Sequence, residues 1–305
     1  MVELGRLLTA MVTPFAPDGS AEHAEAGAVD YACAKRLATA LLDSGSDGLV
    51  VAATTGESPT LTHEEKLRLF SELKREVGER GAIVASVGTN STATSVELAR
   101  EAEPAGVDAL IAVTPYYNKP TQEGLERHFT AIAGATSLPV MLYNVPSRTG
   151  VNMSAETTLR LSAVDNIVGI KEASGDLAQI TKIIEGAPNF RVWSGSDEDT
   201  FAIVKAGGYG AVAVISHLVG RQVRSMIEDA VAGRLAEAGR THERLLPLID
   251  ALFLVANPMP VKYALNQLGF AVGAPRLPLC EPDAATAERI MAEVRRHQID
   301  LPVAV

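Results

Sequence analysis

The hydrophobic and polar positions divide the chain into two kinds of alternating segment. Short, nearly continuous apolar runs are separated by longer stretches in which apolar residues recur every three or four positions. Continuous apolar runs are typical of parallel strands covered on both faces, and the longer period is typical of amphipathic helices. Eight strands are predicted, over residues 7–15, 48–53, 82–88, 109–115, 139–145, 167–174, 191–197 and 210–216.

The predicted helices carry recognisable start and stop signals. Glu65 lies three residues after Thr62, which is the spacing of a capping box, so a helix is expected to begin after Thr62. Gly106 is expected to end the helix that contains Thr94, because glycine readily adopts the left-handed conformation there. Eight strands that alternate with helices predict an α/β fold, the (β/α)₈ TIM barrel. The alternative, an open doubly wound sheet, usually has fewer strands and often carries a GxGxxG motif, which is absent.

The apolar strand pattern stops near residue 220, and the remainder of the chain has helical periodicity. The first of these helices is expected to close the barrel, and the others to form a C-terminal helical appendage. We therefore divide the chain into a barrel, residues 1–230, and a C-terminal helical region packed on it, residues 231–305. No Gly/Ser-rich linker marks a separately folding domain.

Composition narrows the range of functions. The 305 residues carry a formal net charge of −10 and contain no block of five like charges, so the basic stripe of a nucleic-acid-binding surface is missing. No apolar run approaches membrane-spanning length, and the N-terminus lacks the features of a signal peptide. We therefore expect a cytoplasmic protein without a nucleic-acid or membrane partner. Cys33 and Cys280 have no metal-ligand spacing and are expected to remain reduced.

Lys171 interrupts the apolar pattern of the sixth predicted strand. Ammonium groups are rarely buried without a partner, so this position needs an explanation. Strand alternation places Gly169, Lys171 and Ala173 on one face, and the small neighbours are expected to leave space beside a lysine that points into the barrel mouth. A neutral amine in such a confined site can attack a ketone and form a Schiff base. The alternative is a lysine paired with a buried carboxylate.

Other polar residues follow predicted strands at the end of the barrel where TIM-barrel active sites lie. Tyr143 ends the fifth strand, and its phenol can transfer protons. Thr54 and Thr55 open a glycine-containing turn whose hydroxyl and N–H groups can hold a carboxylate. Arg148 follows Pro146 in a constrained loop and can bind a carboxylate with two hydrogen bonds. Each of these features alone is also compatible with a purely structural role. Tyr143 could be a core tyrosine, the threonine turn an ordinary loop, and Arg148 a solvated arginine.

Other reaction classes find little support. The chain has no HExxH, P-loop or GxSxG motif. The histidines show no metal-ligand spacing; they are His23, His63, His128, His217, His242 and His297. Neither a metal site nor an organic cofactor is therefore expected. His128 and His242 are expected on helix surfaces, and His217 at the barrel rim.

Four motifs together resemble one enzyme family. They are TTGES (54–58), TPYYNKP (114–120), YNVPSRTG (143–150) and GIKEASGD (169–176). Nearly the whole chain is similar to the 4-hydroxy-tetrahydrodipicolinate (dihydrodipicolinate) synthases, a branch of the pyruvate-dependent class I aldolases that also include N-acetylneuraminate lyase. The resemblance implies condensation of pyruvate with L-aspartate 4-semialdehyde in lysine and diaminopimelate biosynthesis, without a cofactor. It also implies a homotetramer built as a dimer of dimers.

The resemblance assigns a role to each matching residue. Lys171 corresponds to the Schiff-base lysine and Tyr143 to the proton-relay tyrosine. Thr54 and Tyr117 complete the relay, the tyrosine reaching across a subunit interface. Thr55 would bind the pyruvate carboxylate, and Arg148 the carboxylate of the aldehyde substrate.

The resemblance extends to substrate binding and regulation. Gly195 and Val212 are placed in the substrate-binding set, while Ala213 departs from the serine that relatives carry in the eighth strand. Lysine-sensitive relatives have a histidine at Lys66 and a glutamate at Thr94. A ligand ammonium needs a carboxylate or several acceptors, so weak or no inhibition by lysine is expected.

Two further functions are compatible with the same residues. Another pyruvate aldolase, acting on sialic or 2-keto-3-deoxy sugar acids, would keep Lys171 and Tyr143 but would need a hydroxyl-binding pocket instead of Arg148. A catalytically inactive barrel that serves as a binding subunit is a third possibility, which the complete set of reactive residues disfavours.

Overall fold

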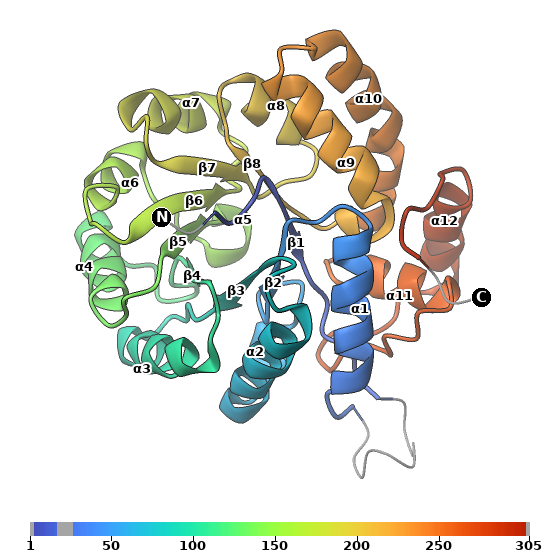
Figure 1. Ribbon diagram of the computed structural model, residues 1–305, viewed down its shortest axis with the longest axis horizontal. Helices are drawn as coiled ribbons and strands as arrows, with labels where there is room; N and C mark the ends of the chain where they lie inside the picture. Colours follow the sequence, from blue (N-terminus) through green and yellow to red (C-terminus); the bar gives the residue numbers. More distant parts are fainter. Residues whose placement is uncertain (1–2, 17–26, 303–305) are drawn as a thin grey trace.

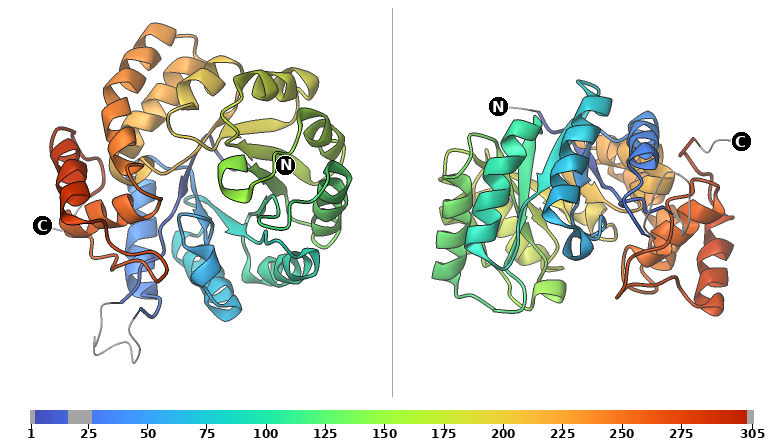
Figure 2. Two further views of the ribbon diagram at one scale, coloured as in Figure 1. Left: turned by 180° about the vertical axis from the view of Figure 1, so that it is seen from behind. Right: turned by 90° about the horizontal axis from the view of Figure 1, so that it is seen from below.

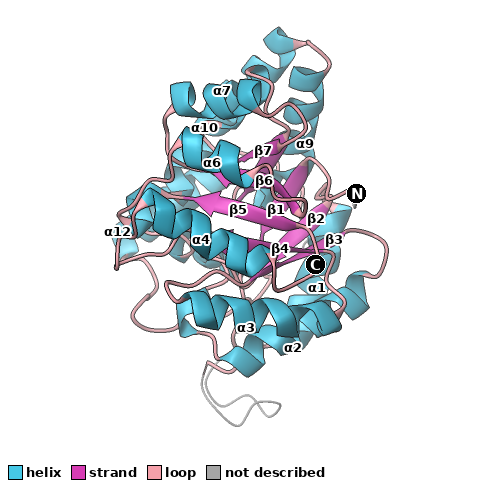
Figure 3. Ribbon diagram, turned by 90° about the vertical axis from the view of Figure 1, so that its left-hand side faces the viewer, coloured by secondary structure: helices cyan, strands magenta, loops and turns pink. Residues whose placement is uncertain are grey.

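The computed structural model describes residues 3–16 and 27–302. Eight parallel strands pair in sequence order, and pairing between the last and the first closes the barrel. Helices surround this central ring of strands, as Figure 1 and the side view in Figure 3 show. The predicted TIM barrel is confirmed. The strands are β1 (Leu7–Ala10), β2 (Gly48–Val51), β3 (Ala82–Ser86), β4 (Ala109–Val113), β5 (Val140–Asn144), β6 (Ile167–Glu172), β7 (Arg191–Ser194) and β8 (Gly210–Ala213).

Helices follow the strands and continue after the last one. The helices around the barrel are α1 (Tyr31–Asp43), α2 (His63–Val77), α3 (Thr92–Ala102), α4 (Gln122–Ala133), α5 (Pro146–Thr149), α6 (Ala155–Leu161), α7 (Leu177–Gly186), α8 (Thr200–Lys205) and α9 (Ser216–Val231). The C-terminal helices are α10 (Leu235–Leu252), α11 (Met259–Gln267) and α12 (Ala284–Val294). Within residues 3–16 and 27–302, none of the helices combines the length and apolarity needed to cross a membrane.

Local sequence signals explain where these elements begin and end. The capping box at Thr62 and Glu65 is formed at the start of α2, as predicted. The helix expected to reach Gly106 ends earlier, at Ala102, because Pro104 lacks the N–H group that another α-helical turn requires. A 3₁₀ turn, Glu103–Ala105, follows, and Gly106 closes it with a φ of +81°. Every strand begins within one residue of its predicted start and ends before its predicted end, since the last residues of each run belong to the loops.

The barrel interior is filled by apolar side chains, among which Trp193 is fully buried. The expectation that Gly169 leaves space beside Lys171 is wrong. A Cβ atom at Gly169 would lie 2.5 Å from Cζ3 of Trp193, so the indole already occupies that space. The Trp193 Nε1–H group donates a hydrogen bond to the Gly5 carbonyl oxygen at 3.1 Å, which fixes the ring below the lysine. Glycine at position 169 therefore serves core packing.

The C-terminal helices lie together on one side of the barrel, as both views in Figure 2 show. Helix α10 packs against α8 and α9, and α12 packs against α10 and α11. Their buried residues Leu248, Val261 and Ile290 belong to the same apolar core as Leu37 of α1. A boundary at residue 230 stays an interpretation of the sequence: α9 ends at Val231, and the core is continuous across this point.

Two of the histidines that the structure describes, His128 and His217, are buried, contrary to the sequence predictions for both. The side chain of His128 lies between α3 and α4, where Nδ1 shares a hydrogen bond with the Thr92 hydroxyl at 2.9 Å and Nε2 has no partner. His217 is fully buried in α9, not at the rim: its Nε2 accepts from the Val12 N–H group and its Nδ1 bonds the Val214 carbonyl oxygen. Burial lowers the pKa of each imidazole to about 4.

We expect these imidazoles to make the fold acid-sensitive. Their pKa is lower in the folded than in the unfolded chain, so their neutral state stabilises the fold fully above pH 6.5, and this contribution is lost as the pH falls toward 4. Between pH 7.5 and pH 5 the free energy of unfolding should fall by about 2 kcal/mol less in the His128→Leu variant than in the unaltered protein. Denaturant unfolding of both proteins at both pH values measures this difference; equal pH dependence would contradict it.

Candidate active site

A cavity of about 370 Å³ opens at the carboxyl end of the barrel strands. Its walls come from the loops after β2, β5, β6, β7 and β8, together with the end of α10 and the segment before α11. Most of the predicted site residues line it: Thr54, Thr55, Tyr143, Arg148, Lys171 and Gly195. Residues more than a hundred positions apart in the sequence therefore share one site.

Lys171 lies at the centre of this arrangement. The backbone register pairs it with Tyr143 of β5 on one side and Trp193 of β7 on the other. The side chain is 4% exposed, and its Nζ atom lies 4.3 Å from the centroid of the Tyr143 ring. Among the described residues, Lys171 forms no ion pair, whereas the buried Lys262 pairs with Glu57. Lys171 therefore lacks the carboxylate partner of a purely structural lysine.

The space around Lys171 is created by Gly195, in the turn after β7. A Cβ atom at Gly195 would lie 2.9 Å from the lysine Cγ atom and 2.9 Å from the Ala173 Cβ atom. The Gly195 N–H group also donates to the Glu172 carbonyl oxygen at 2.7 Å, which ties the two strand ends together. Glycine at this position therefore lets the lysine chain pass into the cavity.

Asp197 is a cavity residue that the sequence prediction missed. Its carboxylate is buried and accepts hydrogen bonds from the N–H groups of Val214 and Ile215, at distances of 2.9 to 3.2 Å. Burial raises its pKa to about 6, although those two N–H groups and the Lys171 charge act in the opposite direction. In the sequence it is one of three consecutive acidic residues, a pattern that normally indicates a solvated loop.

The turn after β2 presents two threonines to the cavity. Thr55 is buried, and its hydroxyl oxygen accepts a hydrogen bond from Nδ2 of Asn257 at 2.9 Å. Asn257 precedes α11 and lines the cavity as well, and its own Oδ1 atom is buried without a partner. The C-terminal region thus contributes directly to the site. Sequence reasoning missed Asn257 because no strand pattern marks its segment.

Arg148 lies on α5, a single helical turn that follows β5. Pro146 opens this turn with a backbone angle suited to a helix, and Gly150 ends it in the left-handed conformation, with a φ of +74°. The arginine side chain is exposed at the cavity mouth, and among the described residues it forms no ion pair. A guanidinium held in this way can receive a carboxylate that enters from solvent.

Two predicted site residues lie apart from the cavity wall. Tyr117 is 89% exposed in the loop after β4, and its φ of +73° is unusual for a tyrosine. The neighbouring Tyr116 lines a smaller adjoining cavity that also contains Thr54 and Tyr143. Val212 is packed inside the barrel below the site, and Val214 is the residue of that segment that reaches the cavity.

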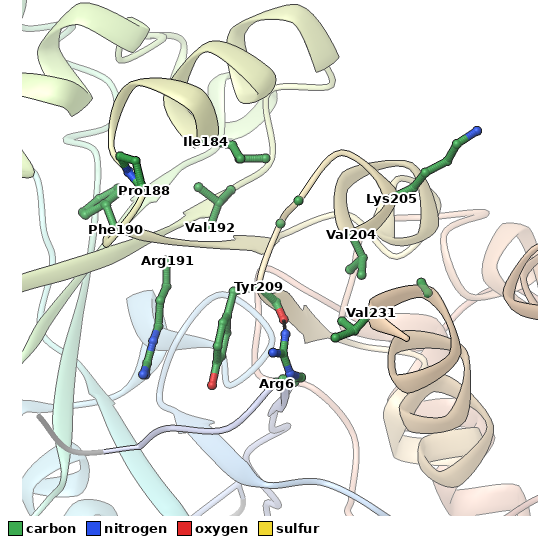
Figure 4. A pocket seen from close by; sticks show the side chains of 13 residues that line it. Arg6, Ile184, Pro188, Phe190, Arg191, Val192, Val204, Lys205, Tyr209 and Val231 are labelled. Atoms are coloured by element: carbon green, nitrogen blue, oxygen red, sulfur yellow. Dashed lines mark hydrogen bonds between the residues drawn. The ribbon is translucent and has the colours of Figure 1, made fainter. Parts of the chain in front are cut away.

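A different cavity, of about 410 Å³, lies at the opposite end of the barrel (Figure 4). There the Tyr209 ring is stacked between the guanidinium groups of Arg6 and Arg191, whose carbon atoms lie 4.5 and 4.6 Å from the ring centroid. Lys205 points away from this cavity. Because the amino ends of barrel strands generally carry stabilising contacts, we assign this cluster to the fold. In the described part of the chain, no three potential metal ligands form a cluster.

Comparison with known proteins places this geometry in a family. Residues 3–297 match the model of the dihydrodipicolinate synthetase family. The chain is 55% identical to a 4-hydroxy-tetrahydrodipicolinate synthase of Dehalococcoides mccartyi over 99% of its length and 100% of the relative, and 53% identical to one of Moorella thermoacetica, covering 96% and 98%. A dihydrodipicolinate synthase structure from Bacillus anthracis is 42% identical with a TM-score of 0.92 and coverage of 97% and 99%. A structure from Cyanidioschyzon merolae with lysine bound is 43% identical, with a TM-score of 0.92 and coverage of 96% and 97%. The chain therefore belongs to the dihydrodipicolinate synthetase family.

Proposed function

We propose that this enzyme condenses pyruvate with L-aspartate 4-semialdehyde to give 4-hydroxy-tetrahydrodipicolinate, in the biosynthesis of diaminopimelate and lysine. The observation that carries the proposal is the buried Lys171, free of an ion pair, in a cavity whose mouth holds Arg148. Family membership supports the same reaction. We propose the cytoplasm as its location, and the free thiols of Cys33 and Cys280 suit such a reducing compartment.

Lys171 acts as the nucleophile in this proposal. Its neutral Nζ adds to C2 of pyruvate, and loss of water from the carbinolamine gives an imine. Removal of a C3 proton converts the imine to an enamine, because the imine nitrogen accepts the electron pair. C3 then attacks the aldehyde carbon of the second substrate, whose oxygen is protonated. Finally the substrate amine attacks the imine carbon and displaces Lys171, which closes the ring and frees the enzyme.

Tyr143 is the group best placed to move protons during these steps. Its ring lies against the lysine amine, so its phenol can protonate the departing hydroxyl and later take a proton from the incoming amine. Thr54 lines the same cavity and extends the relay toward the loop of Tyr116 and Tyr117. The pyruvate carboxylate is assigned to the turn at Thr55, where hydroxyl and N–H donors are available. Gly195 leaves room for this small substrate, and Val212 supports the cavity floor.

Arg148 is the residue that distinguishes the proposed function from that of a sialate-type aldolase. A guanidinium at the cavity mouth suits a carboxylate-bearing aldehyde, whereas the sugar-derived aldehydes of sialate-type aldolases require groups that bind hydroxyls. The test is an assay with pyruvate and either L-aspartate 4-semialdehyde or N-acetylmannosamine, with product identified by mass spectrometry. We expect turnover with the amino-acid aldehyde alone. Turnover only with the sugar would refute the proposal.

Tyr117 leads to a prediction about assembly. A strongly exposed tyrosine with a strained backbone, close to the catalytic cavity, is best explained if it enters the site of a second copy. We propose a homotetramer made of two dimers as the working form. Sedimentation at assay concentration should show no active monomer, and Tyr117→Phe should lower kcat about tenfold or more while the assembly stays intact. A fully active monomer would contradict this.

We also predict weak feedback inhibition by lysine. Thr94 lies in the exposed first turn of α3, where its hydroxyl bonds Ser91, and it supplies no charge for a ligand ammonium group. Lys66 of α2 is half-buried, and its ammonium group would repel a second ammonium group there more strongly than in water. Steady-state rates should change little at lysine concentrations below about 1 mM. Thr94→Glu combined with Lys66→His should increase sensitivity, and strong inhibition of the unaltered enzyme would refute the charge argument.

A further inference from the structure

The turn that presents Thr54 and Thr55 is held in an unfavourable backbone conformation. Ala52 and Glu57, on either side of the two threonines, have φ angles of +54° and +58°. Left-handed conformations cost non-glycine residues free energy, so they persist only where surrounding contacts enforce them. Gly56 allows the close approach that the turn needs, since a Cβ atom there would lie 3.0 Å from the Ala52 Cα atom.

A buried ion pair supplies one of these contacts. The Nζ atom of Lys262, in α11, lies 2.8 Å from Oε1 of Glu57, and both side chains are 0% exposed. All three ammonium protons have acceptors, because Nζ also bonds the carbonyl oxygens of Thr13 at 3.0 Å and Ala274 at 3.2 Å. The second carboxylate oxygen of Glu57 accepts from the Arg276 N–H group at 2.9 Å. Such full pairing is what makes two buried charges tolerable.

Hydrogen bonds connect this ion pair to the pyruvate-binding turn. The Glu57 N–H group donates to the Thr54 carbonyl oxygen at 3.1 Å. The Thr13 hydroxyl donates to the Gly56 carbonyl oxygen at 2.7 Å, while the Thr13 carbonyl oxygen accepts from Lys262. The turn is therefore fixed at its outer end by the C-terminal region, and at Thr55 by Asn257 of the same region.

We propose that Glu57 and Lys262 are positioning residues of the reaction: their ion pair orients Thr54 and Thr55 for binding of the pyruvate carboxylate and for proton transfer. This inference rests on the proposed function. It gives the C-terminal helices a catalytic purpose, because α11 holds the turn from outside the barrel. Neither side chain lines the cavity, so both act through the threonines.

The test compares two neutralised ion pairs. Glu57→Gln with Lys262→Met removes both charges together, so that neither is left buried alone. The control is Lys74→Met with Asp108→Asn: this pair, 2.9 Å apart and largely buried, joins the end of α2 to the start of β4, far from the cavity. The readouts are the melting temperature and the pyruvate concentration at which borohydride trapping on Lys171 is half-maximal. Trapping needs pyruvate alone. Trapping on the unaltered enzyme therefore tests whether Lys171 forms an imine, separately from the role of the ion pair.

In the Glu57/Lys262 variant we expect the pyruvate concentration for half-maximal trapping to rise about tenfold or more, because small displacements of positioning groups have large effects on binding and rate. The control variant should lower the melting temperature and leave the pyruvate requirement within about twofold of the unaltered value. Introduced together with Thr55→Val, the Glu57/Lys262 changes should add little further, because both act on the same contact.

An unchanged pyruvate requirement with a lowered melting temperature would overturn the proposal, and so would full additivity with Thr55→Val. If the double variant does not fold, Glu57→Asp provides the decision. It keeps the negative charge but shortens the side chain that reaches the Lys262 ammonium group, so the ion pair is altered without leaving Lys262 buried alone. A raised pyruvate requirement in that variant supports the proposal, and an unchanged one overturns it.

Discussion

Replacing Lys171 with alanine is expected to lower kcat/KM by about 10³-fold or more, because the imine route has no other nucleophile to carry it. The lysine is buried at the centre of the cavity. Lys205 lies at the other end of the barrel and points away from the cavity there. Steady-state kinetics with L-aspartate 4-semialdehyde measures the loss. Circular dichroism checks that the barrel stays folded.

The Lys171→Arg variant tests whether the reaction requires the amine of Lys171 or only its positive charge. Arginine keeps a cation in the cavity but does not form an imine with pyruvate at neutral pH, so this variant should be as inactive as Lys171→Ala. The matched control is Lys182→Ala, which changes an exposed lysine paired with Glu156 on the outer surface. Activity retained in Lys171→Arg would show that the charge, and not the amine, matters.

Replacing Arg148 with alanine is expected to lower kcat/KM for the aldehyde by about 10²-fold, which corresponds to the loss of one charge-assisted contact. Borohydride trapping of pyruvate on Lys171 should remain, since imine formation precedes aldehyde binding. The rate of trapping and the kinetics with varied aldehyde are the two measurements.

The control for this prediction is Arg127→Ala. Arg127 is 80% exposed on α4 and pairs with Glu123, at the outer face of the barrel. Its removal should leave both measurements unchanged. If Arg148→Ala keeps the normal kinetics with the aldehyde, then Arg148 does not contact that substrate, and the choice between the two aldolase functions must rest on other groups.

The strand pattern predicted the barrel because its signal is strong at every repeat. Strands buried on both faces have continuous apolar runs, so each predicted start is correct within one residue. The ends were predicted too late because apolar residues such as Val145 and Val214 continue into the loops, where they line the cavity. Apolar character alone does not distinguish a strand from the wall of a binding site.

The candidate site was partly predictable, since its polar residues interrupt apolar runs. Lys171 and Tyr143 stood out in this way, and the structure brings them together. Asp197 and Asn257 could not be identified, because acidic and amide residues in loops are usually solvated and their burial depends on tertiary packing.

Burial also explains the errors at Gly169 and His128. A glycine in a strand indicates close approach of another group, but the sequence does not say that the group is Trp193. His128 occupies a helix face that α3 covers, and a helical pattern does not reveal which polar positions a neighbouring helix will bury. Contacts between distant segments decide both cases.

The most direct test of the central claim is to incubate the enzyme with pyruvate and borohydride and to locate the adduct by peptide mass spectrometry. We predict one reduced pyruvate adduct per chain, on Lys171, and none on the Lys171→Ala variant. An adduct on Lys119, Lys182 or Lys205 instead, or no adduct at all, would contradict the assignment of Lys171 as the nucleophile.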